Sequence, residues 1–198
     1  MKLTTRELCY SAIFICLMAI GANLTSWAPF LAIPIGGVSV PLSLQTFFSI
    51  LAGLLLGKRV GALSMIGYLL LGVIGVPVFA QLQGGPFVLI SYTGGFLISF
   101  IFVAFITGYL TEKKSNFTKS TIIYVCLVGV MVNYIIGVSY MYLAMNSWLG
   151  IEVGYLTAWI SMIPFLIKDA GLALVAMVIY IRYYRLFPSI SPHLKPKY

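Results

Sequence analysis

The sequence predicts an all-α membrane protein of six transmembrane helices with both termini in the cytoplasm. Composition, the length of the apolar runs and the placement of the basic residues predict this. Of 198 residues, 61% are hydrophobic and 8% are charged, against about 45–50% and about 25% in soluble domains. Such a chain requires lipid around it, where the backbone must pair internally. The apolar runs lack the alternation of a membrane-barrel strand, so we expect helices.

Six runs are long enough to cross a bilayer, which takes about 20 mostly apolar residues. These runs are 8–27, 40–57, 60–80, 87–110, 121–146 and 155–181. The first run is longer than the hydrophobic stretch of a signal peptide, so we interpret it as a retained helix. The chain shows no internal repeat and no composition shift that would mark a second domain. We therefore expect residues 1–198 to form a single integral membrane domain.

The basic residues set the expected topology. With six helices, one side of the membrane holds Lys2, Arg6, Lys58, Arg59, Lys113, Lys114, Lys119, Arg182, Arg185, Lys195 and Lys197. The connections on the other side contain Glu152 and no basic residue, and Lys168 alone departs from the pattern. Because basic loops stay inside, both termini are expected in the cytoplasm. The charges follow topology and form no basic module, so nucleic-acid binding is not expected.

Two connections on the expected outer side are uncharged and rich in glycine and proline. They cover 28–39 and 81–95. Irregular apolar backbone is tolerated at membrane depth where it packs on protein or lines a cavity. We interpret both connections as lids over an outward-facing pocket. The alternative is a pair of tight connections without a further role.

Two charged residues lie within the predicted spans, Lys168 and Asp169. Charges in the hydrocarbon usually face a bundle interior or a watery cavity, so both are candidates for ligand contact. Neighbouring residues point in different directions on a helix, so a direct pair between them is not expected. Asp169 shares a face with Ala173 and Ala176, which suits an inward position. Lys168 could instead extend to the outer interface.

Polar side chains from three predicted helices fall at one depth. Asp169, Gln45 and Asn133 each lie about 18–20 Å above the cytoplasmic end of their own helix. Gly129 and Gly137 flank Asn133 on its face and permit close approach of a helix or a ligand. Hydrogen bonding between helices alone is the alternative role of the two amides. A pocket of this kind suits a small organic molecule with N–H donors and an apolar body.

No residue pattern indicates catalysis, a metal or a cofactor. Cys9, Cys16 and Cys126 have spacings of neither a metal site nor a disulfide framework, and His193 stands alone in a polar tail. Asp169 has no second acid or nucleophile at its depth, so an enzyme is not expected. The chain also lacks a phosphate-binding loop that ends in Gly-Lys-Ser or Gly-Lys-Thr.

Uphill uptake would therefore need a partner that supplies energy. The first predicted helix offers a stripe of small residues that suits helix docking, Ala12, Cys16 and Ala19 or Ile20 at helical spacing. A second stripe, Gly53, Gly57 and Gly61, lies near the cytoplasmic end of the second helix. Packing within the chain is the alternative role of both stripes.

The segment Pro41-Leu42-Ser43-Leu44-Gln45-Thr46-Phe47 resembles the BioY family, the biotin-binding S components of energy-coupling factor (ECF) transporters. The likeness continues at 51–57, 61–64, 68–80, Gly84 with Gly85, Thr93-Gly94-Gly95-Phe96, Tyr134 with Gly137, and Pro164-Phe165 with Asp169. It covers most of residues 8–180 in the family's order. Each piece alone is weak, but the combination is specific.

The resemblance implies an S-component fold in the bacterial cytoplasmic membrane that takes biotin from outside. It implies a T component and two ATPases as partners, and biotin as transported ligand without a cofactor. Ligand contacts are then expected from Asp169, Lys168, Asn133, Gln45, Gln81, Tyr92, Thr93, Gly84 and Gly85. The family's docking pattern in the first helix falls on Ser11, Ala12, Cys16 and Ala19.

The chain departs from the family pattern at two places. Ser91 and Tyr92 replace the common Gly-Pro before Thr-Gly-Gly, and Leu172 replaces a lysine three residues after Asp169. We expect the ureido N–H groups of biotin to face Asp169, and its carboxylate to face Lys168 or N–H groups of a loop. An S component for another vitamin, or an intramembrane enzyme or scaffold, is the alternative function.

Overall fold

The computed structural model describes residues 3–27, 33–35, 38–40, 43–113 and 118–186. Its elements are α1 (Thr5–Ala22), α2 (Leu24–Trp27), β1 (Ile33–Ile35), β2 (Val38–Val40), α3 (Gln45–Ile74), η2 (Ala80–Leu82), α4 (Phe87–Ile90), α5 (Gly94–Lys113), α6 (Lys119–Ser147) and α7 (Tyr155–Leu186). The predicted helical fold is confirmed. The antiparallel pair of β1 and β2, three residues each, was not predicted. Most of the connection 28–39, together with Lys2, Lys114, His193, Lys195 and Lys197, lies outside the described residues.

The long element α3 folds back on itself at Gly57. The backbone of Gly57 has φ 79° and ψ 174°, a non-helical conformation that favours glycine. The side chains of Gln45 and Tyr68 meet at 2.9 Å (Nε2 to OH), although 23 residues of straight helix would separate them by about 35 Å. α3 is therefore two antiparallel arms, 45–56 and 58–74. These arms are the second and third helices that the sequence predicted.

Within the described residues, α1, α5, α6 and α7 are long and apolar enough to cross a membrane, and α3 meets the same criterion over its full 30 residues. With α3 counted as two arms, all six predicted helical segments are present. Several predicted boundaries were wrong, because glycines interrupt the apolar runs. The run 60–80 stops at Ile74, where Gly75 caps the helix in the left-handed conformation. The run 87–110 is divided into α4 and α5 before Gly94.

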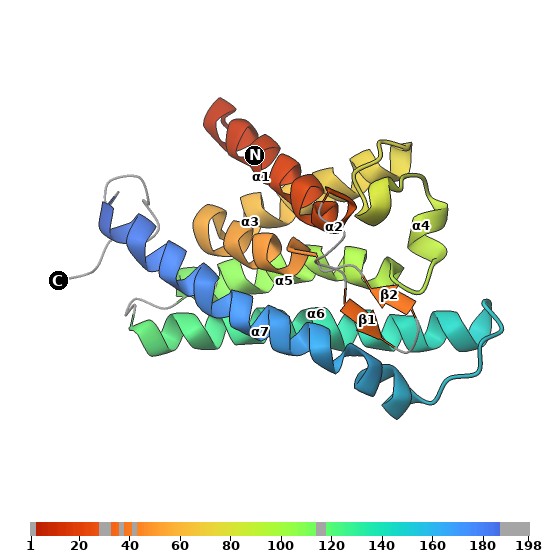
Figure 1. Ribbon diagram of the computed structural model, residues 1–198. Coiled ribbons are helices and arrows are strands. Elements are labelled where there is room, and N and C mark those ends of the chain that lie inside the picture. The colour runs from red at the N-terminus through yellow and green to blue at the C-terminus, as the bar shows by residue number, and fades with distance from the viewer. Residues whose placement is uncertain (1–2, 28–32, 36–37, 41–42, 114–117, 187–198) are drawn as a thin grey trace.

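The helices pack in the order α1, α3, α5, α6 and α7, and α7 returns to contact α3 (Figure 1). Glycines allow the closest approaches. A Cβ on Gly53 would collide with Thr107 and Ala104 of α5, and one on Gly108 with the backbone of Gly57 and Lys58. The stripe at Gly53 and Gly57 therefore serves packing within the chain. The ring of contacts encloses an interior bordered by α3, α5, α6 and α7.

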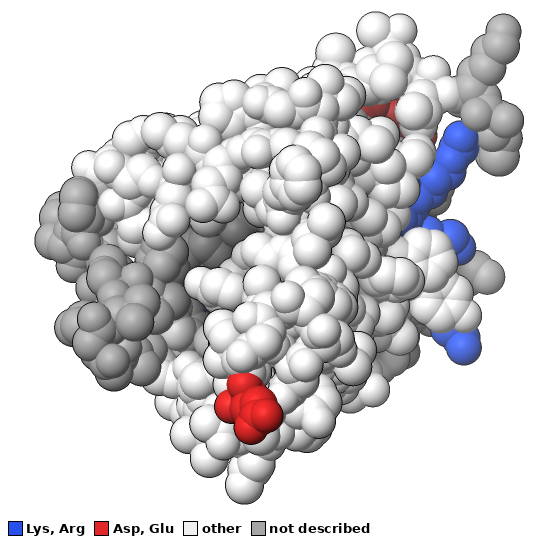
Figure 2. All heavy atoms as spheres, turned by 90° about the vertical axis from the view of Figure 1, so that its right-hand side faces the viewer, with Lys and Arg blue, Asp and Glu red and all other residues white. Residues whose placement is uncertain are grey.

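The two ends of the bundle differ in charge. The start of α6 and the end of α7 lie together at the left of Figure 1, and Lys119 and Arg185 line one hollow there. The turn of α3 carries the ion pair of Lys58 and Glu112, at 3.1 Å. Figure 2 views the opposite end, where acidic atoms show low in the view and, partly covered, at the upper right, and basic atoms show only along the right-hand margin. This separation agrees with the expected topology, and the side of the membrane on which each end lies stays a prediction.

Candidate ligand-binding site

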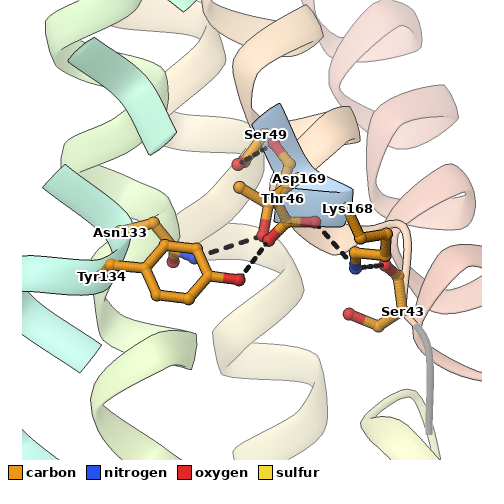
Figure 3. Close-up of polar contacts among 7 residues, drawn as sticks. All are labelled: Ser43, Thr46, Ser49, Asn133, Tyr134, Lys168 and Asp169. Atoms are coloured by element: carbon orange, nitrogen blue, oxygen red, sulfur yellow. Dashed lines mark hydrogen bonds and ion pairs between the residues drawn. The ribbon is translucent and has the colours of Figure 1, made fainter. Parts of the chain in front are cut away.

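The carboxylate of Asp169 is the central group of a buried polar cluster. The residue is 3% exposed. Its Oδ2 accepts a hydrogen bond from the Tyr134 hydroxyl at 2.9 Å, and its Oδ1 lies 2.7 Å from Lys168 Nζ (Figure 3). Among the described residues, Oδ1 receives no well-aligned hydrogen bond. Because an ionised carboxylate has about four acceptor sites, Asp169 keeps acceptor capacity for a further donor.

The direct pair of Lys168 and Asp169 contradicts the expectation from helix geometry. The two Cβ atoms do point in different directions, but the four-carbon stem of lysine is long enough to bring the ammonium to its neighbour. The ammonium also donates to the Ser43 carbonyl at 2.6 Å. The side chain of Lys168 is 19% exposed and is directed toward the residues before α3. Its alternative role, extension to the outer interface, stays a prediction.

A second group of polar contacts joins α3, α5 and α6. Ser99 donates to Asn133 Oδ1 at 2.6 Å, and Asn133 Nδ2 donates to Thr46 Oγ1 at 3.2 Å. All three side chains are buried. The amide of Asn133 has two N–H groups, and a second one remains for another acceptor. The contacts with Ser99 and Thr46 therefore hold the Asn133 side chain in place and leave one of its N–H groups able to donate.

The contacts place the predicted residues at one level. Asn133 and Tyr134 are adjacent on α6, and they contact Thr46 of α3 and Asp169 of α7. Figure 3 shows these side chains converging from the three helices. The helical rise predicted this common depth.

The glycines beside Asn133 have a packing role. A Cβ on Gly129 would lie 2.7 Å from Thr107 of α5, and one on Gly137 would collide with Phe96. The small-residue stripe around Asn133 therefore admits a neighbouring helix. Of the two alternatives left by the sequence, close approach of a helix is the one that the structure shows.

Gln45 lies at the same level but contacts a different partner. Its Nε2 donates to the Tyr68 hydroxyl, which donates in turn to the Val78 carbonyl at 3.0 Å. The position beside Asn133 belongs to Thr46, which sequence reasoning did not single out. Ser99 and the hydroxyl of Tyr134 were missed as well. Serine and threonine hydroxyls in apolar helices often bond to their own backbone, as Ser49 does to Thr46 O, so polarity alone did not mark Thr46 or Ser99. Thr46 and Tyr134 do lie in segments that carry the family resemblance, and that was the signal the sequence offered for them.

The remaining predicted ligand residues lie between α3 and α5. Gln81, Tyr92 and Thr93 are exposed, and Thr93 Oγ1 is 2.9 Å from Ser91 Oγ. In the part of the chain that the structure describes, no hydrogen bond joins these three to Asp169 or Asn133. The structure thus brings together Asp169, Lys168 and Asn133, and it leaves the polar groups of this segment outside that cluster.

Gly84 and Gly85 shape the same segment. A Cβ on Gly84 would lie 2.7 Å from the Val76 carbonyl oxygen, so the backbone packs closely there. Gly85 has φ 98°, and its N–H donates to Gly72 O at 2.7 Å. Both positions therefore need glycine for backbone geometry, and no described contact links either of them to Asp169.

The predicted docking residues of α1 differ in exposure. Ala12 and Cys16 are exposed, whereas Ser11 and Ala19 are half-buried. The opposite side of α1 holds Phe14, which is buried in the core. The face with Ala12 and Cys16 is therefore available to lipid or to another helix.

A hollow at the basic end is separate from this cluster. It is lined by Lys119, Ile122, Tyr180, Ile181, Tyr184 and Arg185. Tyr180 lies about 16 Å along α7 from Asp169. No three His, Cys, Asp or Glu side chains in the described ranges are grouped to hold a metal ion.

Apolar helices that enclose one carboxylate define a multi-pass membrane protein with a buried polar site. The chain belongs to the BioY family, whose family model matches residues 1–189. It is similar to the putative biotin transporter BioYB of Bacillus subtilis strain 168, with 42% identity over 184 residues that cover 93% of this chain and 90% of that protein. It is also similar to the biotin transporter BioY of Rhizobium etli, with 32% identity over 89% of this chain and 92% of that protein.

A solved structure has the same fold. It is the crystal structure of the S-component for biotin from an ECF-type ABC transporter, and it aligns with a TM-score of 0.78 and 28% sequence identity. The alignment covers 93% of this chain and 95% of that chain. The likeness therefore extends over the whole helical bundle.

Proposed function

We propose that this protein is the substrate-binding S component of an ECF-type ABC transporter and that it captures biotin from outside the cell. The observation that carries the proposal is the buried carboxylate of Asp169, whose Oδ1 has acceptor capacity left. Biotin presents two N–H donors on its ureido ring. A carboxylate is the strongest acceptor that a side chain can offer to such donors. Membership in a family with relatives named biotin transporters supports the same ligand.

The neighbouring side chains match the rest of biotin. Asn133 has a free N–H for the ureido carbonyl, and Gln81 could supply another. Lys168 has three donors and a positive charge for the ligand carboxylate, beside the Ser43 carbonyl that it already contacts. The rings of Phe96 and Tyr134, which meet edge to face with centroids 5.9 Å apart, offer an apolar wall for the thioether ring.

We propose that the outer connections complete the site when ligand is present. Gln81, Gly84, Gly85, Tyr92 and Thr93 lie on the segment between α3 and α5, at the end of the bundle that has no basic cluster. The backbone N–H of Gly84 can be offered to a ligand carboxylate, whereas the Gly85 N–H already donates to Gly72 O and holds the segment in shape. This arrangement would make the segment 75–93 a lid above Asp169. Gln45 would then contribute through its remaining amide groups.

Energy for uptake comes, in this proposal, from a T component and two ATPases, because the chain has no phosphate-binding loop of its own. The exposed side of α1, with Ala12 and Cys16, is the proposed docking face, flanked by Ser11 and Ala19. The protein lies in the cytoplasmic membrane with its basic end and both termini inside.

Binding by the purified chain tests the proposal. The protein is purified alone in detergent, and co-purified small molecules are identified by mass spectrometry. Competition among biotin, riboflavin and thiamine for the emptied protein then ranks the ligands. Biotin as the tightest ligand is the expected result. Preference for another vitamin would assign a different S component, and no binding of any of the three would favour a scaffold or an enzyme.

A further inference from the structure

Asn23, which no part of the proposed site includes, holds the segment 78–82 at both ends. The residue caps the C-terminus of α1 and is 2% exposed. Its Oδ1 accepts from the Leu82 N–H at 2.7 Å. Its Nδ2 donates to Ala19 O at 3.0 Å and makes a longer bond to Val78 O at 3.4 Å. One side chain of α1 thus spans the loop that carries Gln81.

The segment that Asn23 holds has a costly backbone conformation. Gln81 and Leu82 are consecutive non-glycine residues with φ of 60° and 56°. L-residues rarely adopt this conformation, and it persists only where surrounding contacts impose it. The Phe79 N–H closes the turn by donating to Gln83 O at 3.0 Å. The bond from Leu82 to Asn23 fixes the second of the two left-handed residues.

A second contact holds the same loop from α3. The Tyr68 hydroxyl donates to the Val78 carbonyl at 3.0 Å and accepts from Gln45 Nε2 at 2.9 Å. Tyr68 and Gln45 are both buried. The Phe79 ring is buried as well, and it meets the Tyr68 ring edge to face at 5.6 Å. Val78 O therefore accepts from two helices, α1 and α3.

The residues that open α3 connect this loop to Asp169. Gln45 contacts Tyr68, whereas the next residue, Thr46, contacts Asn133. Two residues before Gln45, the Ser43 carbonyl accepts from Lys168. The Leu44 N–H also donates to Gly21 O of α1 at 2.9 Å. Residues 43–46 thus lie between the loop contacts and the polar cluster.

We propose that Asn23 is a positioning residue for ligand binding. It fixes segment 78–82, which Tyr68 joins to the start of α3, relative to Asp169. The identity of the ligand in this proposal rests on the proposed function. Asn23 itself is not among the residues predicted to contact the ligand. Since Asn23 ends α1, any displacement of α1 is transmitted to Val78 and Leu82. The helix with the proposed docking face is therefore mechanically linked to the loop above the site.

The test compares Asn23→Ala and Tyr68→Phe with a matched control in lipid nanodiscs. The control is Asn146→Ala, because the side chain of Asn146 also makes two hydrogen bonds to the backbone of a loop, here the loop between α6 and α7. Its Nδ2 donates to Val153 O at 3.0 Å, and its Oδ1 accepts from the Val153 N–H at 3.2 Å. Hydrogen exchange of residues 76–86 is measured without ligand. Biotin affinity and dissociation rate are measured separately.

The proposal predicts that Asn23→Ala speeds exchange in 76–86 by about tenfold and raises the biotin Kd by about fivefold through faster dissociation, as expected for a lost hydrogen bond. Tyr68→Phe should likewise speed exchange in 76–86 and raise the biotin Kd. If Asn23→Ala does not fold, the result for Tyr68→Phe tests the proposal in its place. Asn146→Ala should change exchange near 148–154 alone. Unchanged exchange in 76–86, or faster exchange with an unchanged Kd, would overturn the proposal.

Failure of the proposed function gives a different result. If the unaltered protein binds no biotin, the ligand assignment is wrong. The exchange measurement uses no ligand, so it would still decide whether Asn23 holds the segment.

Discussion

The pair of Lys168 and Asp169 permits a quantitative test of the buried cluster. Three variants are compared in the ligand-free protein: Lys168→Met, Asp169→Asn and the double variant. Methionine keeps the length of the side chain without its charge, and asparagine keeps the shape of the carboxylate. The quantity of interest is the interaction energy, the amount by which the double variant differs from the sum of the single variants.

The structure sets the expected magnitude. Removal of one partner from a buried ion pair costs about 3–5 kcal/mol, because the other charge is left uncompensated. Lys168 is 19% exposed and Asp169 is 4% exposed at their side chains, so we expect about 3 kcal/mol for Lys168→Met. Asp169→Asn should cost about 1–2 kcal/mol, because Lys168 keeps its bond to Ser43 O. The double variant leaves no unpaired charge, and the interaction energy should reach about 1.5 kcal/mol or more.

Thermal unfolding in detergent measures these differences. For a chain of this length, 1 kcal/mol corresponds to about 2–4 °C, so Lys168→Met should lower Tm by about 6–12 °C. Lys58→Met is the control, because the pair of Lys58 and Glu112 has side chains 42% and 26% exposed and should contribute no more than about 1 kcal/mol. Strictly additive losses in the double variant would refute the reasoning.

Three further predictions concern the cluster, the turn of α3 and the topology. Tyr134→Phe removes the donor to Asp169 Oδ2 and should lower the free energy of unfolding by about 1.5–3 kcal/mol. Thermal unfolding measures this loss. Gly57→Ala should cost about 1–3 kcal/mol, because its φ and ψ are accessible almost solely to glycine. Gly171→Ala, where a Cβ meets no atom within 4 Å, should be neutral or stabilising in the same assay. A fluorescent protein that folds only in the cytoplasm should fluoresce when fused to the C-terminus, and a dark fusion at normal expression would contradict the topology.

The helical segments could be predicted from the sequence because lipid imposes a length and a composition on each of them. The apolar runs gave six helices, the placement of the basic residues agreed with that number, and the turn at Gly57 lies where Lys58 and Arg59 predicted a connection. The ends of the segments were less predictable. Apolar character continues past Ile74, and the local backbone of Gly75 ends the helix there.

The candidate site was predictable where a charge lies in an apolar helix and only partly elsewhere. Asp169 and Asn133 stood out by polarity and depth. In the structure Asp169 contacts Tyr134, the residue next to Asn133 on α6. The pair of Lys168 and Asp169 was missed because helix geometry describes Cβ directions and not the reach of a long side chain. The direction of Gln45 depends on Tyr68, which comes near only because α3 folds back.

Equilibrium biotin binding to the unaltered protein and to Asp169→Asn tests the central claim most directly. Thermal unfolding and Glu112→Gln, a matched change in an acid at the basic end of the bundle, serve as controls. Two hydrogen bonds to a charged acceptor are worth about 1.5–3 kcal/mol each, so the account predicts at least about 100-fold weaker binding by Asp169→Asn and no change for Glu112→Gln. A folded Asp169→Asn variant that binds biotin with unchanged affinity would contradict the account.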